Sequence, residues 1–222
     1  MKILVLAAHP DDEVLGCGGT LHKLSKSDNQ IHLAFAADGV SGYKNHSQKE
    51  INQRKKAMLK VADKLSAKVV GKSRPPFRDQ QLDRENFNKI VGWAEKLITQ
   101  VKPDILYTHW SKDLNRDHRI VSEAVMVASR PWSAQLKEIY AFEVPENSCE
   151  GGIFAGESFN PNIYETIDLE KKKSLMACYE TETARSGKWL AGVEALATYR
   201  GFNAGVSYAE AFVLIRKINA KD

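Results

Sequence analysis

The chain has 222 residues, a length that one large domain accommodates, so we expect residues 1–222 to form a single domain. A composition of 43% hydrophobic and 27% charged residues excludes a disordered or fibrous protein. The net charge of +4 is spread along the chain without a block of like charges, which argues against a nucleic-acid-binding arm.

The cysteines and the amino terminus indicate where the protein acts. Three cysteines at long spacings predict neither a disulfide framework nor a C-x-x-C metal site. The unbroken apolar run from Ile3 to Ala8 is too short for a signal peptide or a membrane-spanning helix. We therefore expect a cytoplasmic protein with no membrane span.

Apolar runs and amphipathic segments alternate along the chain. Continuous apolar runs are typical of strands buried on both faces, and apolar residues at helical spacing are typical of helices that cover a sheet. In chain order the predicted elements are a strand at 2–9, a helix at 18–28, a strand at 30–38, a helix at 47–66, a strand at 67–71, a helix at 85–100, a strand at 102–110, a helix at 117–129 and a strand at 138–144. The carboxyl-terminal third is less regular, with strand candidates at 162–169 and 211–218.

This alternation predicts an α/β fold, a Rossmann-like three-layer sandwich with a mostly parallel sheet. Ligands of such folds bind beyond the carboxyl ends of the strands. We therefore expect three segments to meet at one edge of the sheet, namely the residues from His9, 38–46 and 109–118.

The segment HPDDE has the composition of half a metal site. His9 stands at a strand end and Asp12 lies three positions later, so both side chains can reach one ion. A third ligand can come from His118, which ends the polar loop after the fourth predicted strand. Two imidazoles and one carboxylate leave a position open for water, which is typical of catalytic zinc. Asp11 is a spare carboxylate that can take the proton of that water.

The motifs HPDDE, VLGCGGT and DLNRDH, in this order, resemble those of the PIG-L/LmbE family of zinc-dependent N-deacetylases. A weaker match at RGFNAGVSYAEAF extends the resemblance over essentially the whole chain. It implies a Rossmann-like fold and removal of an N-acetyl or other N-acyl group from a small-molecule amino sugar of the N-acetylglucosamine type. It also implies zinc at His9, Asp12 and His118, with Fe²⁺ as a possible replacement, and Asp11 as the general base.

The resemblance further implies that Arg54 and Asn115 bind the substrate. Many members of the family carry a histidine at the position of Asn115, where it stabilises the oxyanion or protonates the leaving amine. Asparagine can donate a hydrogen bond but cannot shuttle a proton at neutral pH. Asp11, once protonated, or His109 could supply the acid instead.

Four further features receive structural interpretations. Asp117 either caps a helix or orients His118 or a neighbouring donor as a second-shell carboxylate. Glu13 belongs to a first helical turn or bonds to a metal ligand. The glycines of GCGG lack the spacing of a dinucleotide fingerprint and indicate close packing of a helix. Residues 171–173 are interpreted as a solvated lysine face.

Two other functions stay open. Two histidines and one carboxylate also form the facial triad of ferrous oxygenases. The same α/β sheet could instead carry a non-catalytic sugar-binding module. The sequence leaves the native metal, the particular N-acylated sugar and the oligomeric state undetermined, a homo-oligomer being possible.

Overall fold

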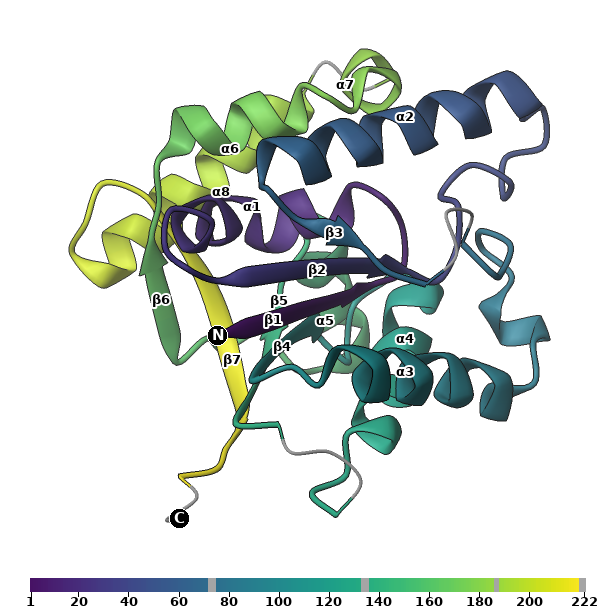
Figure 1. Cartoon of the computed structure of the whole chain (residues 1–222). Helices are drawn as coiled ribbons and strands as arrows, with labels where there is room; N and C mark the ends of the chain where they lie inside the picture. Colours follow the sequence, from purple (N-terminus) through teal and green to yellow (C-terminus); the bar gives the residue numbers. More distant parts are fainter. Residues whose placement is uncertain (72–74, 133–135, 186–187, 220–222) are drawn as a thin grey trace.

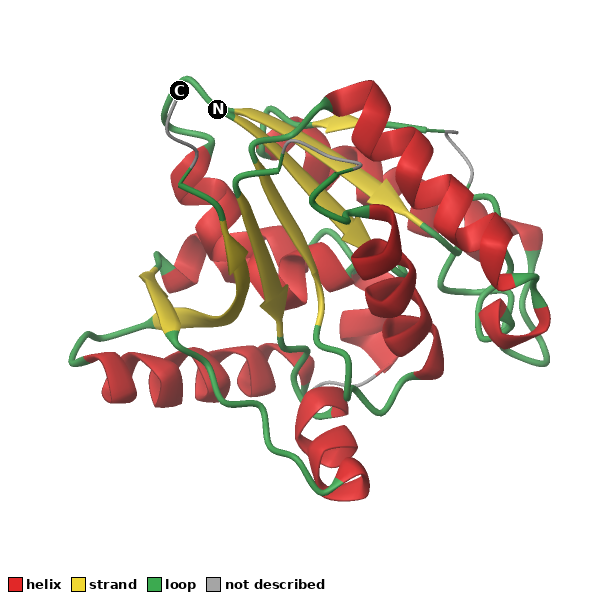
Figure 2. Cartoon of the chain, turned by 90° about the horizontal axis from the view of Figure 1, so that it is seen from below, coloured by secondary structure: helices red, strands yellow, loops and turns green. Residues whose placement is uncertain are grey.

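The molecule is built around one seven-stranded sheet with helices on both faces (Figures 1 and 2). The computed structural model describes residues 1–71, 75–132, 136–185 and 188–219. The strand order is β3–β2–β1–β4–β5–β7–β6, with the first five strands parallel and β7 antiparallel to both of its neighbours. The expected α/β architecture with a mostly parallel sheet is confirmed.

The strands are β1 (Lys2–Ala7), β2 (Gln30–Phe35), β3 (Lys68–Val69), β4 (Ile105–His109), β5 (Glu138–Phe142), β6 (Ile163–Thr166) and β7 (Ala209–Lys217). The helices are α1 (Asp12–Leu24), α2 (Gln48–Lys64), the short 3₁₀ helix η1 (Leu82–Arg84), α3 (Phe87–Val101), α4 (Arg116–Ala128), α5 (Asn147–Ala155), α6 (Leu169–Met176), α7 (Glu180–Arg185) and α8 (Trp189–Ala204).

The central strands are buried on both faces, as their continuous apolar runs predict. Along β1, Ile3 and Val5 pack with α1, α2 and α6 on one face, whereas Leu4 and Leu6 pack with α3 and α4 on the other. Figure 1 shows these two helical layers above and below the sheet. Burial on two sides fixes the register of the strands and therefore the position of the loops that follow them.

The two ends of the chain differ in how well the sequence predicted them. Each predicted strand and helix up to residue 144 is present, although the bounds differ and α1 begins at Asp12 rather than at residue 18. Beyond residue 144 a helix was expected only at 171–173, where α6 lies; α5, α7 and α8 were not predicted, since glycines interrupt α5, α7 has only six residues and the apolar residues of α8 do not keep to one face. The interpretation of residues 171–173 as a solvated face was wrong for Lys172, which is 3% exposed.

Close packing explains the glycines of GCGG, as predicted. A Cβ atom on Gly16 would lie 2.2 Å from the ring of Phe142, and one on Gly19 would lie 2.7 Å from Ile167. Between these two glycines the helix α1 is broken at Cys17, whose φ of −144° and ψ of 18° are not helical. The two parts of α1 therefore lie deep against β5 and the segment before α6.

Within the described ranges, no helix is both long enough and apolar enough to cross a membrane.

Candidate metal centre and active site

Three chain segments bring polar side chains to one edge of the sheet. His9 follows β1, and His118 lies in the first turn of α4 after β4. The arrowheads of β1 and β2 in Figure 1 point to this edge. A backbone hydrogen bond from Phe77 to Ala36 brings Asp79 to the same place beyond the end of β2. The predicted meeting of these segments is found, with Asp79 as an unexpected member.

His9, Asp12 and His118 form a compact group. One donor atom from each residue lies within 4.8 Å of the other two, and all three residues are buried. His118 Nε2 lies 3.3 Å from Asp12 Oδ1, and His9 Nδ1 lies 3.4 Å from Asp12 Oδ2. Two imidazole nitrogens and a carboxylate oxygen at this separation are the donor set of a catalytic zinc site, so the residues fit the predicted metal.

The second nitrogen of each histidine faces a carboxylate. His9 Nε2 lies 3.1 Å from Asp117 Oδ2 and 3.0 Å from Asp79 Oδ1, and His118 Nδ1 lies 3.1 Å from Asp113 Oδ1. Such carboxylates fix the orientation and tautomer of histidine ligands. Asp117 thus lies beside His9, and the carboxylate beside His118 is that of Asp113, which was not predicted.

A second group, His9 with Asp79 and Asp117, also has the spacing of metal ligands. Asp117 is already occupied there, because its two carboxylate oxygens accept hydrogen bonds from the backbone N–H groups of Gln80 and Leu82. In the first group, by contrast, the inward nitrogens of two histidines and the carboxylate of Asp12 converge. His9, Asp12 and His118 are therefore the better candidate for a metal position, with Asp12 Oδ2 also accepting the His9 backbone N–H at 2.8 Å.

The buried carboxylates alter the pKa values of both histidines. Burial disfavours the charged form of His118, but the negative charges of Asp12 and Asp113 outweigh it and raise the pKa of His118 to about 9. Burial likewise disfavours the charged form of His9, but the carboxylates of Asp117, Asp12 and Asp79 outweigh this effect and raise the pKa of His9. An environment that stabilises a positive charge on these rings also favours a bound dication.

Asp11 is held in an unusual conformation beside the ligands. Its φ of 133° is rare for a residue with a side chain. Its N–H donates to Glu13 Oε2 at 2.9 Å, and Glu13 Oε1 accepts the hydroxyl proton of Tyr179. Glu13 therefore holds the backbone of Asp11 in place. The sequence had indicated only a place in the first helical turn or a hydrogen bond to a metal ligand. Strained backbone of this kind is common at active sites.

The carboxyl group of Asp11 lies in an open cavity next to the metal ligands. Burial raises its pKa to about 8, and the neighbouring guanidinium of Arg54 opposes that rise. A carboxyl whose pKa lies near neutrality can both accept and release a proton. The side chains that line the cavity include Asp11, Tyr43, Arg54, Asp79, Gln80, Asn115, Asn147, Glu182 and Trp189.

Arg54 reaches this cavity from α2, but its guanidinium group is hydrogen-bonded and ion-paired with other groups of the protein. Its Nη1 donates to Pro10 O at 2.7 Å and to Asp11 Oδ2 at 3.0 Å, and its Nη2 pairs with Glu182. The side chain is 3% exposed. Arg54 thus holds the HPDDE loop in place, and its predicted contact with substrate stays a prediction.

Asn115 lines the cavity as expected and also caps α4. Its Oδ1 accepts a hydrogen bond from Asp117 N at 2.9 Å. Because the amide oxygen is used by the helix, the amide nitrogen is the group that Asn115 retains for other partners. The predicted substrate contact of Asn115 stays a prediction.

His109 is unsuited to the role of general acid. Its Nε2 accepts a hydrogen bond from Ala8 N at 2.9 Å, and its ring stacks on His118 with centroids 4.0 Å apart. Burial and the adjacent His118 lower the pKa of His109 to about 4, so the ring is neutral. Because Nε2 accepts from Ala8, the one proton of the neutral ring is on Nδ1, and His109 is not among the residues that line the cavity.

Sequence reasoning missed Asp79, Asp113 and Glu182. Asp113 begins the motif DLNRDH, five residues before His118, so its place in that motif was a usable signal. Asp79 lies in an irregular segment, and Glu182 lies in a short helix far along the chain. No periodicity marks either of them.

The chain belongs to the PIG-L family, because the family model described as GlcNAc-PI de-N-acetylase matches residues 4–129. The resemblance noted in the sequence is thereby confirmed. The match contains β1 to α4 and hence all three residues of the candidate metal centre.

Individual relatives agree with this assignment. The deacetylase YaiS of Escherichia coli K12, described as uncharacterized, is 26% identical over 176 residues, which cover 76% of this chain and 83% of the relative. The N,N'-diacetylchitobiose deacetylase of Pyrococcus horikoshii superposes with a TM-score of 0.78 at 20% identity, over 96% of this chain and 83% of that one.

Another solved structure with this fold has a different activity. GalB of Pseudomonas putida KT2440, a 4-carboxy-2-hydroxymuconate hydratase, superposes with a TM-score of 0.75 at 18% identity, over 100% of this chain and 98% of that one. At such low identity the superpositions establish the shared fold alone. The reaction has to be argued from the site.

Proposed function

We propose that this protein is a zinc-dependent hydrolase that removes an N-acetyl group from an N-acetylglucosamine-type sugar or its conjugate, with residues 1–222 as one catalytic domain. The observation that carries the proposal is the convergence of His9, Asp12 and His118 beside a cavity that also contains Asp11. The names of the family and of the Pyrococcus horikoshii enzyme, both concerning acetylated glucosamine compounds, support the substrate class.

His9 Nδ1, His118 Nε2 and a carboxylate oxygen of Asp12 would hold the metal. Bound zinc would polarise the amide carbonyl and lower the pKa of a water molecule. Asp113 and the pair Asp79 and Asp117 keep the two imidazoles aimed at this position. The same three donors also suit Fe²⁺, which we propose as an alternative metal.

Asp11 is the proposed general base. Its carboxylate takes a proton from the attacking water, which adds to the amide carbon, and Arg54 holds the carboxylate in position during this step. When the carbon–nitrogen bond breaks, the same carboxyl returns the proton to the leaving amine, and acetate and the free amine result. One residue then serves as base and acid, which accommodates the absence of a histidine at position 115.

Asn115 is proposed to donate its amide N–H to the substrate oxygen that becomes negative. Its amide oxygen is used by α4, so the amide group has a fixed orientation. A positioned donor at a developing oxyanion contributes most when it needs no reorganisation. For Arg54 we propose an action on the substrate through Asp11, whose carboxylate it binds.

Acetate release tests the reaction. Purified protein loaded with zinc is incubated with free, disaccharide, lipid-linked, nucleotide-linked and thiol-conjugated N-acetylglucosamine, and acetate and free amine are measured. We expect both products in equal amounts from at least one compound. Asp11→Asn should lower kcat by about 10²- to 10⁴-fold with unchanged zinc content, because it removes the proton acceptor and keeps the shape.

A matched control is Asp63→Asn, which changes an exposed aspartate of α2. It should leave acetate release unchanged. Oxygen consumption with an iron-loaded sample would favour the oxygenase alternative. Sugar binding without any product would favour the non-catalytic module, and water addition to an unsaturated acid would favour a hydratase. Failure to release acetate from every compound, or full activity of Asp11→Asn, would overturn the proposal.

A further inference from the structure

The break in α1 leaves backbone groups without helical partners in the helix that begins with Asp12. In a continuous helix, Gly19 N–H would bond to Leu15 O and Thr20 N–H to Gly16 O. The non-helical backbone of Cys17 separates these pairs. The first part of α1, which carries Asp12 and Glu13, keeps its own bond from Leu15 N to Asp11 O at 2.9 Å, but the regular hydrogen bonds of a helix do not join it to the second part.

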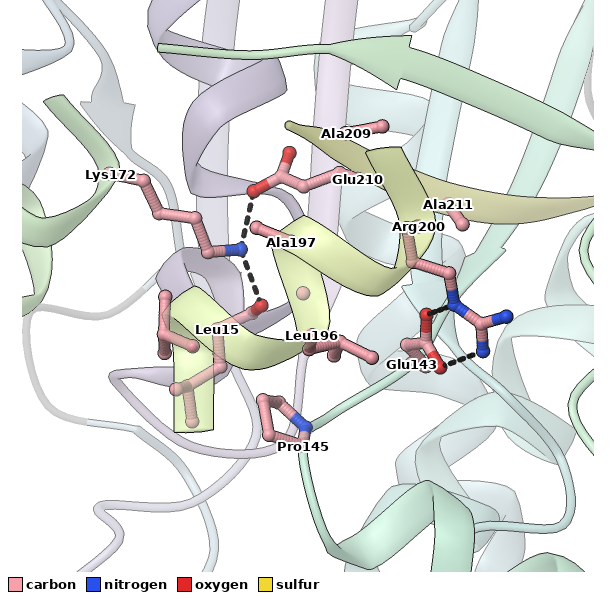
Figure 3. Close-up of a pocket in the computed structure, with 12 residues that line it drawn as sticks. Leu15, Glu143, Pro145, Lys172, Leu196, Ala197, Arg200, Ala209, Glu210 and Ala211 are labelled. Carbon is pink, nitrogen blue, oxygen red and sulfur yellow. Dashed lines mark hydrogen bonds and ion pairs between the residues drawn. The ribbon is translucent and has the colours of Figure 1, made fainter. Parts of the chain in front are cut away.

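Two side chains from the carboxyl-terminal third, Lys172 and Glu210, bond to these groups, and Figure 3 shows them paired with each other beside Leu15. Glu210 of β7 accepts from Gly19 N at 2.8 Å through Oε1 and from Thr20 N at 2.7 Å through Oε2. Lys172 of α6 donates through Nζ to Leu15 O at 2.8 Å and to Glu210 Oε1 at 2.5 Å. Lys172 and Glu210 therefore join the end of the first part of α1 to the beginning of the second.

The arrangement is fully enclosed. Lys172 is 3% exposed and Glu210 is 5% exposed. Burying two opposite charges is costly, and apolar residues of similar size often stabilise a protein as well or better. What an apolar pair could not do is satisfy two N–H groups and one carbonyl at a break in a helix. The Lys172–Glu210 pair is therefore better explained by the backbone geometry that it imposes on α1 than by a contribution to the overall stability of the fold.

We propose that Glu210 and Lys172 are positioning residues of the metal centre, which set the orientation of the turn that carries Asp11 and Asp12. What this turn does chemically rests on the proposed function. The inference also assigns a role to the motif RGFNAGVSYAEAF, since Glu210 lies within it. Gly201 of the same motif packs its α-carbon against the turn before β7, where a Cβ atom would lie 2.5 Å from Ser207 O. The motif thus delivers Glu210 to α1.

The test compares Glu210→Gln with a matched variant in the same cavity wall. Glutamine keeps the size of glutamate but offers only one acceptor oxygen for the two N–H groups. The matched variant is Glu143→Gln, which removes the buried partner of Arg200 shown in Figure 3. Glu143 and Glu210 are similarly buried, and the hydrogen bonds of the Glu143 carboxylate go to Arg200 rather than to α1.

Three quantities are measured, namely zinc affinity by chelator competition, kcat and KM separately, and amide hydrogen exchange of residues 14–24 in the zinc-free protein. Glu210→Gln should weaken zinc binding and lower kcat by about 10- to 100-fold, and it should speed exchange at Gly19 and Thr20. Glu143→Gln should lower the thermal midpoint without these changes. The double variant Lys172→Met with Glu210→Gln carries neither charge, so it leaves no unpaired buried charge that could unfold the protein. It should show the same loss of zinc affinity as Glu210→Gln.

The outcomes separate this inference from the proposed function. If Glu210→Gln and the double variant bind zinc as tightly as the unaltered protein, or if exchange at Gly19 and Thr20 is unchanged, the positioning role is refuted. If the unaltered protein neither binds zinc nor releases acetate, the proposed function fails. In that case hydrogen exchange in the zinc-free protein still decides whether Glu210 holds α1.

Discussion

Gly16→Ala should destabilise the fold by about 2 kcal/mol. The new Cβ atom would lie 2.2 Å from Cδ2 and 2.5 Å from Cγ of Phe142, whereas non-bonded carbon atoms prefer about 3.5–4.0 Å. The ring of Phe142 is fully buried and cannot turn into solvent. Overpacking of this kind costs about 1–3 kcal/mol, and we take the upper value because the overlap reaches Cγ, near the backbone. The helix propensity of alanine offsets at most about 1 kcal/mol of it.

The assay is thermal unfolding followed by circular dichroism with metal chelated. For a chain of this size, 2 kcal/mol corresponds to a decrease of about 4–8 °C in the midpoint. Gly92→Ala is the matched control, since it lies on the exposed side of α3 and a Cβ atom there would meet nothing within 4 Å. It should stabilise the protein by about 0.5–1 kcal/mol. A Gly16→Ala protein as stable as the original, or two shifts of the same sign, would refute the reasoning.

Substitutions at three further positions test the site. His118→Ala removes one of three ligands, so metal analysis after dialysis should find less than one zinc per chain and acetate release should be lost; retained zinc would contradict the assignment. Asn115→Ala should lower the free energy of unfolding by about 1 kcal/mol, because α4 loses its cap. Asn115→Asp should keep the cap and the stability but lower kcat, because a carboxylate cannot donate a hydrogen bond to the substrate. Unfolding measurements and acetate assays distinguish these two effects. Arg54→Met removes the cation that pairs with the buried carboxylates of Asp11 and Glu182 and should cost about 3 kcal/mol in urea unfolding; an unchanged midpoint would show that these pairs are unimportant.

The proximity of the proposed metal ligands could be predicted from the sequence for a simple physical reason. Parallel strands end at a common edge, so a strand followed by HPDDE and another followed by DLNRDH must bring His9 and His118 close together. The spacing of His9 and Asp12 is local and needs no tertiary information. The fold class and the proximity of these three residues could therefore be predicted before any coordinates were known, and their role as metal ligands stays a proposal.

Other features depend on contacts that no local pattern reveals. Asp79 reaches His9 because an irregular segment pairs with the end of β2, and Glu182 reaches Arg54 from a helix that itself was not predicted. The error at Lys172 has the same origin. A run of three lysines is usually solvated, and only the break in α1 gives the middle one a buried partner.

The hydrogen bonds between Glu210 and α1 also constrain the order in which the molecule can be completed. They join residues 191 and 190 positions apart in the chain. During synthesis, His9, Asp12 and His118 leave the ribosome well before β7 does, because domains emerge from the amino terminus at roughly 5–20 residues per second. A chain that stops short of β7 would carry the proposed ligands while the break in α1 lacks its acceptor. The helix that carries Asp12 therefore gains its acceptor only once β7 has been made.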